Sequence, residues 1–201
     1  MKTYKSYYTN YDDLAQAWVE GRVGHKGLHT AKSRMFADLN EIYSYGTHFC
    51  IARRWQSVGR KNEWFLLTER RHSQTTETHK YEVFRNLPPD RTILLPQVDN
   101  LHAYGLVNGT DEDLAKVVLE TESERFDNLQ TRYLRMLRPY NREYLEGRFI
   151  ALRDSLARFN LTVPERLVKK HWEAVNHCHT RNVRNAVLDA TANARRRLLA
   201  A

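Results

Sequence analysis

Residues 47–68, THFCIARRWQSVGRKNEWFLLT, decide the fold expected for this chain. The stretch holds two runs rich in aromatic and β-branched side chains, at residues 47–52 and 63–68, and such side chains suit a pleated sheet. Between the runs lies a polar segment, residues 56–62, which contains Gly59. Two strand-like runs on either side of a short break with glycine predict an antiparallel β-hairpin.

Outward from the hairpin, further short segments extend the expected sheet. Residues 41–44 and 92–95 have the composition of strands. Residues 21–33, where Gly21 and Gly24 interrupt the pattern, are expected to form a loop.

Two helices are expected in the same part of the chain. One begins near Asn10, a good N-cap that is followed by two aspartates in the first helical turn. The other begins near Ser73 and ends before Pro88, because proline cannot continue a helix. The fold class expected is therefore α+β, with a small antiparallel sheet and N-terminal helices.

From Thr110 onward the pattern becomes helical. Apolar residues recur every three or four positions over residues 114–137, 145–159 and 167–198, and Pro139 and Pro164 separate the three stretches. The last stretch is expected to form one helix or two, which gives three or four helices in all. Amphipathic helices with short joints favour an antiparallel bundle. We therefore expect an α+β unit at residues 1–109 and a helical unit at residues 110–201, packed together in one compact domain or as two units.

Composition excludes several classes of protein. No run of 18 apolar residues exists, so no membrane span is expected. Residues 1–10 are polar and tyrosine-rich and lack the apolar core of a signal peptide. The two cysteines, Cys50 and Cys178, are far apart, which is typical of a reducing compartment. The expected location is the cytoplasm, of a host cell if the protein is viral.

Charge is distributed unevenly along the chain. The net charge of +8 divides into +4 for residues 1–109, −1 for residues 110–160 and +5 for residues 161–201. An excess of positive charge favours a polyanionic partner but does not identify it. The expected partners are nucleic acid or an acidic host protein, and the oligomeric state is left open.

One end of the hairpin is a candidate anion site. A hairpin turn near residues 58–59 sets His48 opposite residues near Glu69 and Arg70, although a slip of one residue would move His48 to the other face. The next helix starts close by, and a helix N-terminus offers free N–H groups to an anion. The candidate anion-binding residues are Thr47, Arg70, Arg71, Ser73, Thr75 and Thr76. In the alternative interpretation the hydroxyl groups only cap the helix.

The same end holds the only candidate catalytic residues. His48 and His79 could serve as acid and base near neutral pH, which would suit a small phosphodiester-directed enzyme. No nucleophile elbow or phosphate-binding loop accompanies them. Whether the protein is an enzyme is therefore left open.

Two motifs in this region carry a resemblance. The segment Tyr-Ser-Tyr-Gly-Thr-His at residues 43–48, with Ile-Ala at 51–52, and the helix start Ser-Gln-Thr-Thr at 73–76, with His79, resemble a family of tailed-phage proteins. The resemblance covers residues 35–87 and departs from the family pattern at Cys50 and at Glu77-Thr78. It implies a viral or prophage origin and carries no activity over to this chain.

Basic residues at several places are candidates for nucleic-acid binding. They are Arg53, Arg54, Lys169, Lys170, Arg181, Arg184, Arg195, Arg196 and Arg197. Such residues can follow a phosphate backbone. In the alternative interpretation, those near the C-terminus only complement the dipole of the last helix.

No metal or cofactor is expected. His171 and Cys178 share one face of the expected last helix, while His177 and His179 do not face each other. One helix cannot supply the four tetrahedral ligands that zinc prefers. The sequence thus predicts a phage-type accessory protein that binds nucleic acid, with a protein-binding inhibitor or adaptor and a small enzyme as alternatives.

Overall fold

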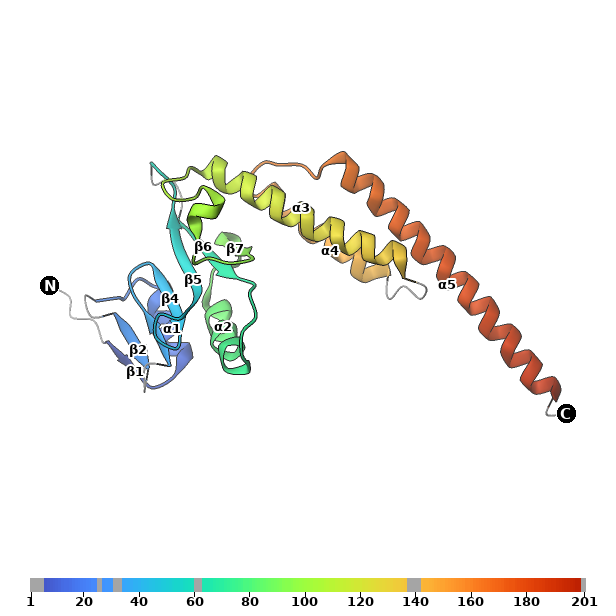
Figure 1. Cartoon of the computed structure of the whole chain (residues 1–201), viewed down its shortest axis with the longest axis horizontal. Helices are drawn as coiled ribbons and strands as arrows, with labels where there is room; N and C mark the ends of the chain where they lie inside the picture. Colours follow the sequence, from blue (N-terminus) through green and yellow to red (C-terminus); the bar gives the residue numbers. More distant parts are fainter. Residues whose placement is uncertain (1–5, 25–26, 31–33, 60–62, 137–141, 200–201) are drawn as a thin grey trace. The chain divides into compact units, whose positions relative to one another are not determined.

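The computed structural model describes residues 6–24, 27–30, 34–59, 63–136 and 142–199. The chain divides into two compact units, Met1–Leu114 and Ala115–Ala201. The first contains a sheet with helices and the second contains helices alone (Figure 1).

The first unit is built around a seven-stranded mixed sheet. Its strands are β1 (Tyr7–Tyr8), β2 (Leu28–Thr30), β3 (Met35–Ala37), β4 (Glu41–Ser44), β5 (Phe49–Gln56), β6 (Glu63–Thr68) and β7 (Thr92–Leu95). Their spatial order follows the sequence order. Strands β2 to β6 pair antiparallel, whereas β1 pairs parallel with β2 and β6 pairs parallel with β7.

The prediction of a small, purely antiparallel sheet is therefore wrong. Each parallel pair is joined through a helix, α1 (Tyr11–Val19) between β1 and β2, and α2 (Gln74–Asn86) between β6 and β7. Parallel neighbours need such a crossover. The expected loop at residues 21–33 contains β2, whose three residues are too few to show an alternating pattern.

The hairpin of β5 and β6 is antiparallel as predicted, with Trp55 opposite Trp64 and Ala52 opposite Leu67. Helix α1 buries Trp18 in the core, where its ring lies 5.7 Å from that of Phe65. Both helices contribute buried side chains to this core, with Val83 coming from α2. On Trp55 the indole Nε1 donates to the carbonyl of Leu106 at 2.8 Å. Short 3-10 helices η2 (Pro89–Arg91) and η3 (Leu101–Tyr104) complete the unit.

The described residues of the second unit form three helices. They are α3 (Asp111–Arg135), whose first turn belongs to the first unit, α4 (Arg142–Ala157) and α5 (Glu165–Leu199). The ring of Phe149 on α4 stacks on His171 of α5 at 4.2 Å, and Phe126 of α3 lies 5.6 Å from Phe149. The aromatic rings therefore fill the space between all three helices.

Helices α3 and α5 run in the same direction. Near the start of α5, Lys170 Nζ donates to Asp127 Oδ1 at 2.8 Å, and farther along His177 lies 3.3 Å from the carbonyl of Met136. Figure 1 shows α5 continuing well past the ends of α3 and α4.

Candidate nucleic-acid interface

The hairpin end has a different register from the one expected. The paired part of β5 and β6 ends at Ala52 and Leu67, and the observed pairs are shifted by one or two residues. His48 lies in the turn between β4 and β5 and is exposed. The side chain that reaches the segment after β6 is Phe49, whose ring lies 5.4 Å from His72 and 6.0 Å from the guanidinium of Arg70.

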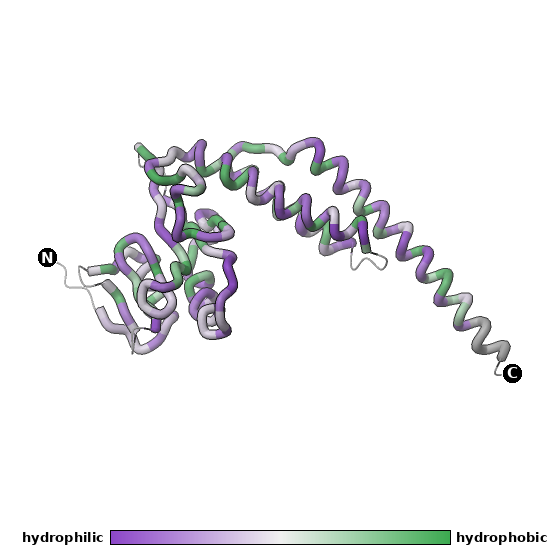
Figure 2. Tube along the Cα trace, in the orientation of Figure 1, coloured by the Kyte–Doolittle hydropathy of each residue, from purple (hydrophilic) through white to green (hydrophobic). Residues whose placement is uncertain are grey.

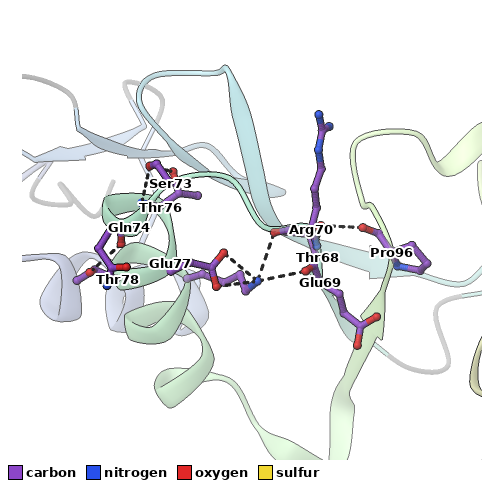
Figure 3. A network of polar contacts seen from close by, with 10 residues as sticks. Thr68, Glu69, Arg70, Ser73, Gln74, Thr76, Glu77, Thr78 and Pro96 are labelled. Atoms are coloured by element: carbon purple, nitrogen blue, oxygen red, sulfur yellow. Dashed lines mark hydrogen bonds and ion pairs between the residues drawn. The ribbon is translucent and has the colours of Figure 1, made fainter. Parts of the chain in front are cut away.

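Two of the candidate anion-binding hydroxyl groups already have intramolecular partners. The side chain of Ser73 caps α2 by accepting from the Thr76 N–H at 3.2 Å (Figure 3). Oγ1 of Thr76 lies 3.0 Å from Oγ of Ser73 and 3.3 Å from Oγ of Ser44, in a buried position. The capping interpretation therefore accounts for both hydroxyl groups.

The other candidates at this end are more accessible. Thr47 and Arg71 are exposed and Thr75 is half-buried. Arg70 is exposed, with a carboxylate oxygen of Asp99 at 3.9 Å. The first turn of α2 also contains Glu77, whose carboxylate lies 3.4 Å from Lys80 Nζ and occupies the positive end of the helix. Anion binding here stays a prediction, and the neighbouring carboxylates weaken its electrostatic basis.

His79 is part of the core rather than of a surface. Its side chain is fully buried, its Nδ1 lies 2.8 Å from Oγ of Ser44, and its ring lies 4.2 Å from that of Tyr11. Nε2 of His79 has no hydrogen-bond partner. Burial, with a smaller contribution from Arg34, lowers the pKa of His79. No hydrogen bond or ring contact joins it to His48 among the residues that the structure describes, so an acid–base pair gains no support.

Arg53 and Arg54 are committed to contacts within the sheet unit. Arg53 forms an ion pair with Glu41, and Arg54 has a carboxylate oxygen of Glu63 at 3.5 Å. Arg54 also donates to the carbonyl of Val19, at the C-terminal end of α1, at 2.6 Å. A cation at that end offsets the helix dipole.

The hollow beside these two arginines has acidic as well as basic side chains among its described lining residues. It has a volume of about 1210 Å³ and is lined by both arginines together with Asp38, Glu41 and Glu63. Three carboxylates face two guanidinium groups, and burial lowers the pKa of both Arg53 and Arg54. The lining residues that the structure describes therefore carry no excess of positive charge for a phosphate backbone.

In the helical unit, Lys170 is also engaged. Its Nζ donates to Asp127 Oδ1 and to Thr131 Oγ1 at 2.7 Å. Lys169, its neighbour, is exposed. Of the two lysines, only Lys169 presents a side chain that solvent or a partner can reach freely.

The second half of α5, in contrast to Arg53, Arg54 and Lys170, presents arginines without ion-pair partners among the described residues. We call residues 179–199 the α5 tail. None of residues 179–193 is buried, Arg184 is exposed and Arg181 is half-buried. Neither arginine has an ion pair with another described residue. Arg195, Arg196 and Arg197 lie in the α5 backbone, and their side chains are outside the described part of the structure.

One line of side chains along α5 changes its chemistry at the start of the tail. In the first half this line is buried and comprises Leu167, His171, Ala174, Val175 and Cys178. With 3.6 residues per turn, the same line continues as Arg181, Asn182, Asn185, Asp189, Ala192 and Asn193, of which all but Ala192 are polar. Figure 2 shows hydrophilic positions interspersed with hydrophobic ones along this helix. The face that packs in the bundle thus becomes a polar face in the tail.

The tail has a second, apolar face. Val183 and Val187 are 51% and 59% exposed, and Ala186 and Ala190 lie on the same side of the helix. The sequence-based candidates included the tail arginines but missed the asparagines. Their spacing from Cys178 onward was the signal that could have revealed the polar face.

His171 and Cys178 of α5 serve packing, whereas His179 is exposed. His171 stacks on Phe149, and burial lowers the pKa of His171. Cys178 is fully buried, and His177 contacts the carbonyl of Met136. Across the described ranges, no group of three or more histidine, cysteine or acidic side chains is placed to hold a metal ion.

No family model matches the chain, and no match was found among the curated proteins or the solved structures. Within the described ranges, no helix combines the length and the apolar composition that crossing a bilayer requires.

Proposed function

We propose that this protein binds nucleic acid through the α5 tail. The observation that carries the proposal is the state of Arg181 and Arg184. Both lie in the part of α5 where none of residues 179–193 is buried, and neither has an acidic partner in the described part of the chain. A guanidinium group in this state is free to contact phosphate oxygens.

Three of the other candidate cations differ in this respect, whereas Lys169 is exposed like the two arginines. Arg53, Arg54 and Lys170 each have a carboxylate partner within their own unit. Recruiting them to phosphate would cost these ion pairs. Arg181 and Arg184 carry no such cost, and they lie on the same helix as three further arginines, Arg195, Arg196 and Arg197.

The charge and length of the tail suit a phosphate backbone. Five arginines and one aspartate, Asp189, give residues 179–199 a net charge of +4. Twenty-one helical residues span about 31 Å. Contacts between arginines and phosphates release condensed counterions, so the binding is expected to weaken steeply as salt rises.

A second candidate function rests on the apolar face of the tail. Val183 and Val187 expose about half of their surface, and alanines between and beyond them complete a narrow apolar stripe. Such a stripe beside arginines fits a helical surface with acidic flanks on a host protein. A phage origin, which would fit either function, remains a prediction from the resemblance alone.

Binding to labelled nucleic acid, followed by fluorescence anisotropy at about 50 mM salt, tests the proposal. The test variant is Arg181→Gln with Arg184→Gln. The matched control is Arg135→Gln with Arg148→Gln, which removes the same charge from exposed positions on α3 and α4. We expect the test variant to bind at least several-fold more weakly than the control, whereas equal affinities of the two variants would refute the proposal.

The second candidate has its own discriminating variant. Val183→Ser with Val187→Ser removes the apolar stripe and leaves the arginines in place. If the tail contacts an acidic protein, this variant loses the partner that the natural chain retains in a pull-down from host lysate. If the tail contacts nucleic acid, the variant keeps its affinity for the labelled probe.

A further inference from the structure

The polar face of the α5 tail carries amide groups as well as arginines. Asn182, Asn185 and Asn193 fall, with Arg181 and Asp189, within about a third of the helix circumference. None of the three asparagine side chains has a hydrogen bond to another described residue. Their amides are therefore free to bind a partner.

These asparagines are not explained by helix stability. Asparagine in a helix interior is less favourable than alanine by about 0.5 kcal/mol or somewhat more. It is tolerated where its side chain caps the helix, but positions 182, 185 and 193 lie inside α5 (Glu165–Leu199). A face that only needed charge and solubility would be served equally well by residues that favour the helix.

We propose that the polar face of the α5 tail enters the major groove of duplex DNA and reads base edges there. This inference rests on the proposed function, since it names the class of nucleic acid that the tail would bind. The major groove of B-DNA admits an α-helix, and its base edges present hydrogen-bonding patterns that an asparagine amide matches at adenine. The face carries three asparagines, and Arg181 lies at its margin, where it can keep its contact with phosphate.

The dimensions agree with this mode of binding. An α-helix with its side chains is about 10–12 Å across, close to the roughly 12 Å width of the major groove of B-DNA. In duplex RNA the major groove is deep and too narrow for side chains to read. The tail therefore matches DNA better than RNA.

Asp189 fits a reading face better than a purely electrostatic one. It is exposed, on the same side as Asn182 and Asn185, and it is the only acidic residue of the tail. An aspartate opposes phosphates but can accept a hydrogen bond from the amino group of cytosine. A surface that needed only positive charge would gain from its removal.

Selection of bound sequences from a randomised duplex DNA library, with the full chain, tests this inference. The test variant is Asn182→Ala with Asn185→Ala. The matched control is Asn128→Ala with Asn176→Ala, which changes an exposed asparagine of α3 and one on the other side of α5. Affinities for the selected duplex, for duplex RNA of the same sequence and for the single strand are then compared by anisotropy.

We expect the natural chain and the control to enrich a short motif and to prefer duplex DNA. We expect the test variant to retain binding but to lose about 5- to 150-fold in discrimination for each base pair that an asparagine reads. Binding without an enriched motif, or with equal affinity for RNA or single strands, would overturn the inference and leave the proposed function standing. Absence of binding to every nucleic acid would overturn both.

Discussion

Cys178 and Arg181 lie one turn apart on the same side of α5, and between them this side changes from buried to accessible. Cys178 is fully enclosed among the helices of the second unit, whereas Arg181 is half-buried and has no ion pair with any described residue. The first half of α5 thus packs in the bundle, whereas its tail presents accessible polar side chains.

Asp189 limits the affinity of the tail for DNA in this account. Asp189→Asn removes the one acidic group from the polar face, so affinity for non-specific duplex at low salt is expected to rise about two- to fivefold, the effect of one exposed charge. Asp154→Asn on α4 is the control, because Asp154 is exposed outside the tail. Equal affinities of the two variants in anisotropy titrations would show that Asp189 does not oppose binding.

Lys170 is expected to matter for stability rather than for DNA binding. Lys170→Gln breaks the ion pair with Asp127, which is about a third exposed, so the cost is about 0.5–1 kcal/mol of unfolding free energy. Arg184→Gln removes the same charge from the tail and is expected to weaken DNA binding more while sparing stability. Urea denaturation gives the unfolding free energy of both variants, and anisotropy gives their affinity for DNA. A larger loss of stability in Arg184→Gln, together with a larger loss of affinity in Lys170→Gln, would contradict this expectation.

Acid is expected to destabilise the helical unit through His171. Burial lowers its folded-state pKa below the usual value near 6.5, so stability is fully present above about pH 6.5. As pH falls from there toward the folded-state pKa, the unfolded chain binds the proton more readily and stability is lost. His79 in the first unit has its pKa lowered for the same main reason and adds to the trend.

His171→Phe keeps a ring beside Phe149 and removes the titrating group. The loss of stability between pH 7 and pH 5, measured by thermal unfolding, is therefore expected to be smaller in this variant. An unchanged loss would show that His171 is not a source of the acid sensitivity.

The hydrogen bond between Ser44 Oγ and His79 Nδ1 is expected to stabilise the sheet unit. Ser44→Ala leaves both ring nitrogens of the fully buried His79 without a protein partner, at a cost of about 1–3 kcal/mol. Thr78→Ala is the control, since Thr78 is exposed on the same helix. Equal midpoints for the two variants in urea denaturation, followed by tryptophan fluorescence, would contradict this role.

Much of the fold could be predicted from local patterns. The strands at residues 41–44, 63–68 and 92–95 are confirmed, because each is long enough to show strand composition. Strands β1 to β3 have only two or three residues each, which leaves no periodicity to detect. The parallel pairs were missed because their pairing depends on how α1 and α2 cross the sheet, which no local pattern encodes.

The candidate interface was predictable only in part. The tail arginines stand out as a basic cluster in the sequence. Lys170 looks equivalent there, because its partner Asp127 is 43 residues away and only the folded unit brings the two together. The same holds for Arg53, because its ion-pair partner Glu41 lies on the neighbouring strand and comes close only in the folded sheet.

The salt dependence of duplex DNA binding tests the central claim, that Arg181 and Arg184 contact phosphates, most directly. Each phosphate contact contributes about 0.9 to the slope of log affinity against log salt. The account predicts that Arg181→Gln with Arg184→Gln reduces the magnitude of this slope by about 1.8, whereas Arg135→Gln with Arg148→Gln leaves it unchanged. Identical slopes for the two double variants would contradict the claim.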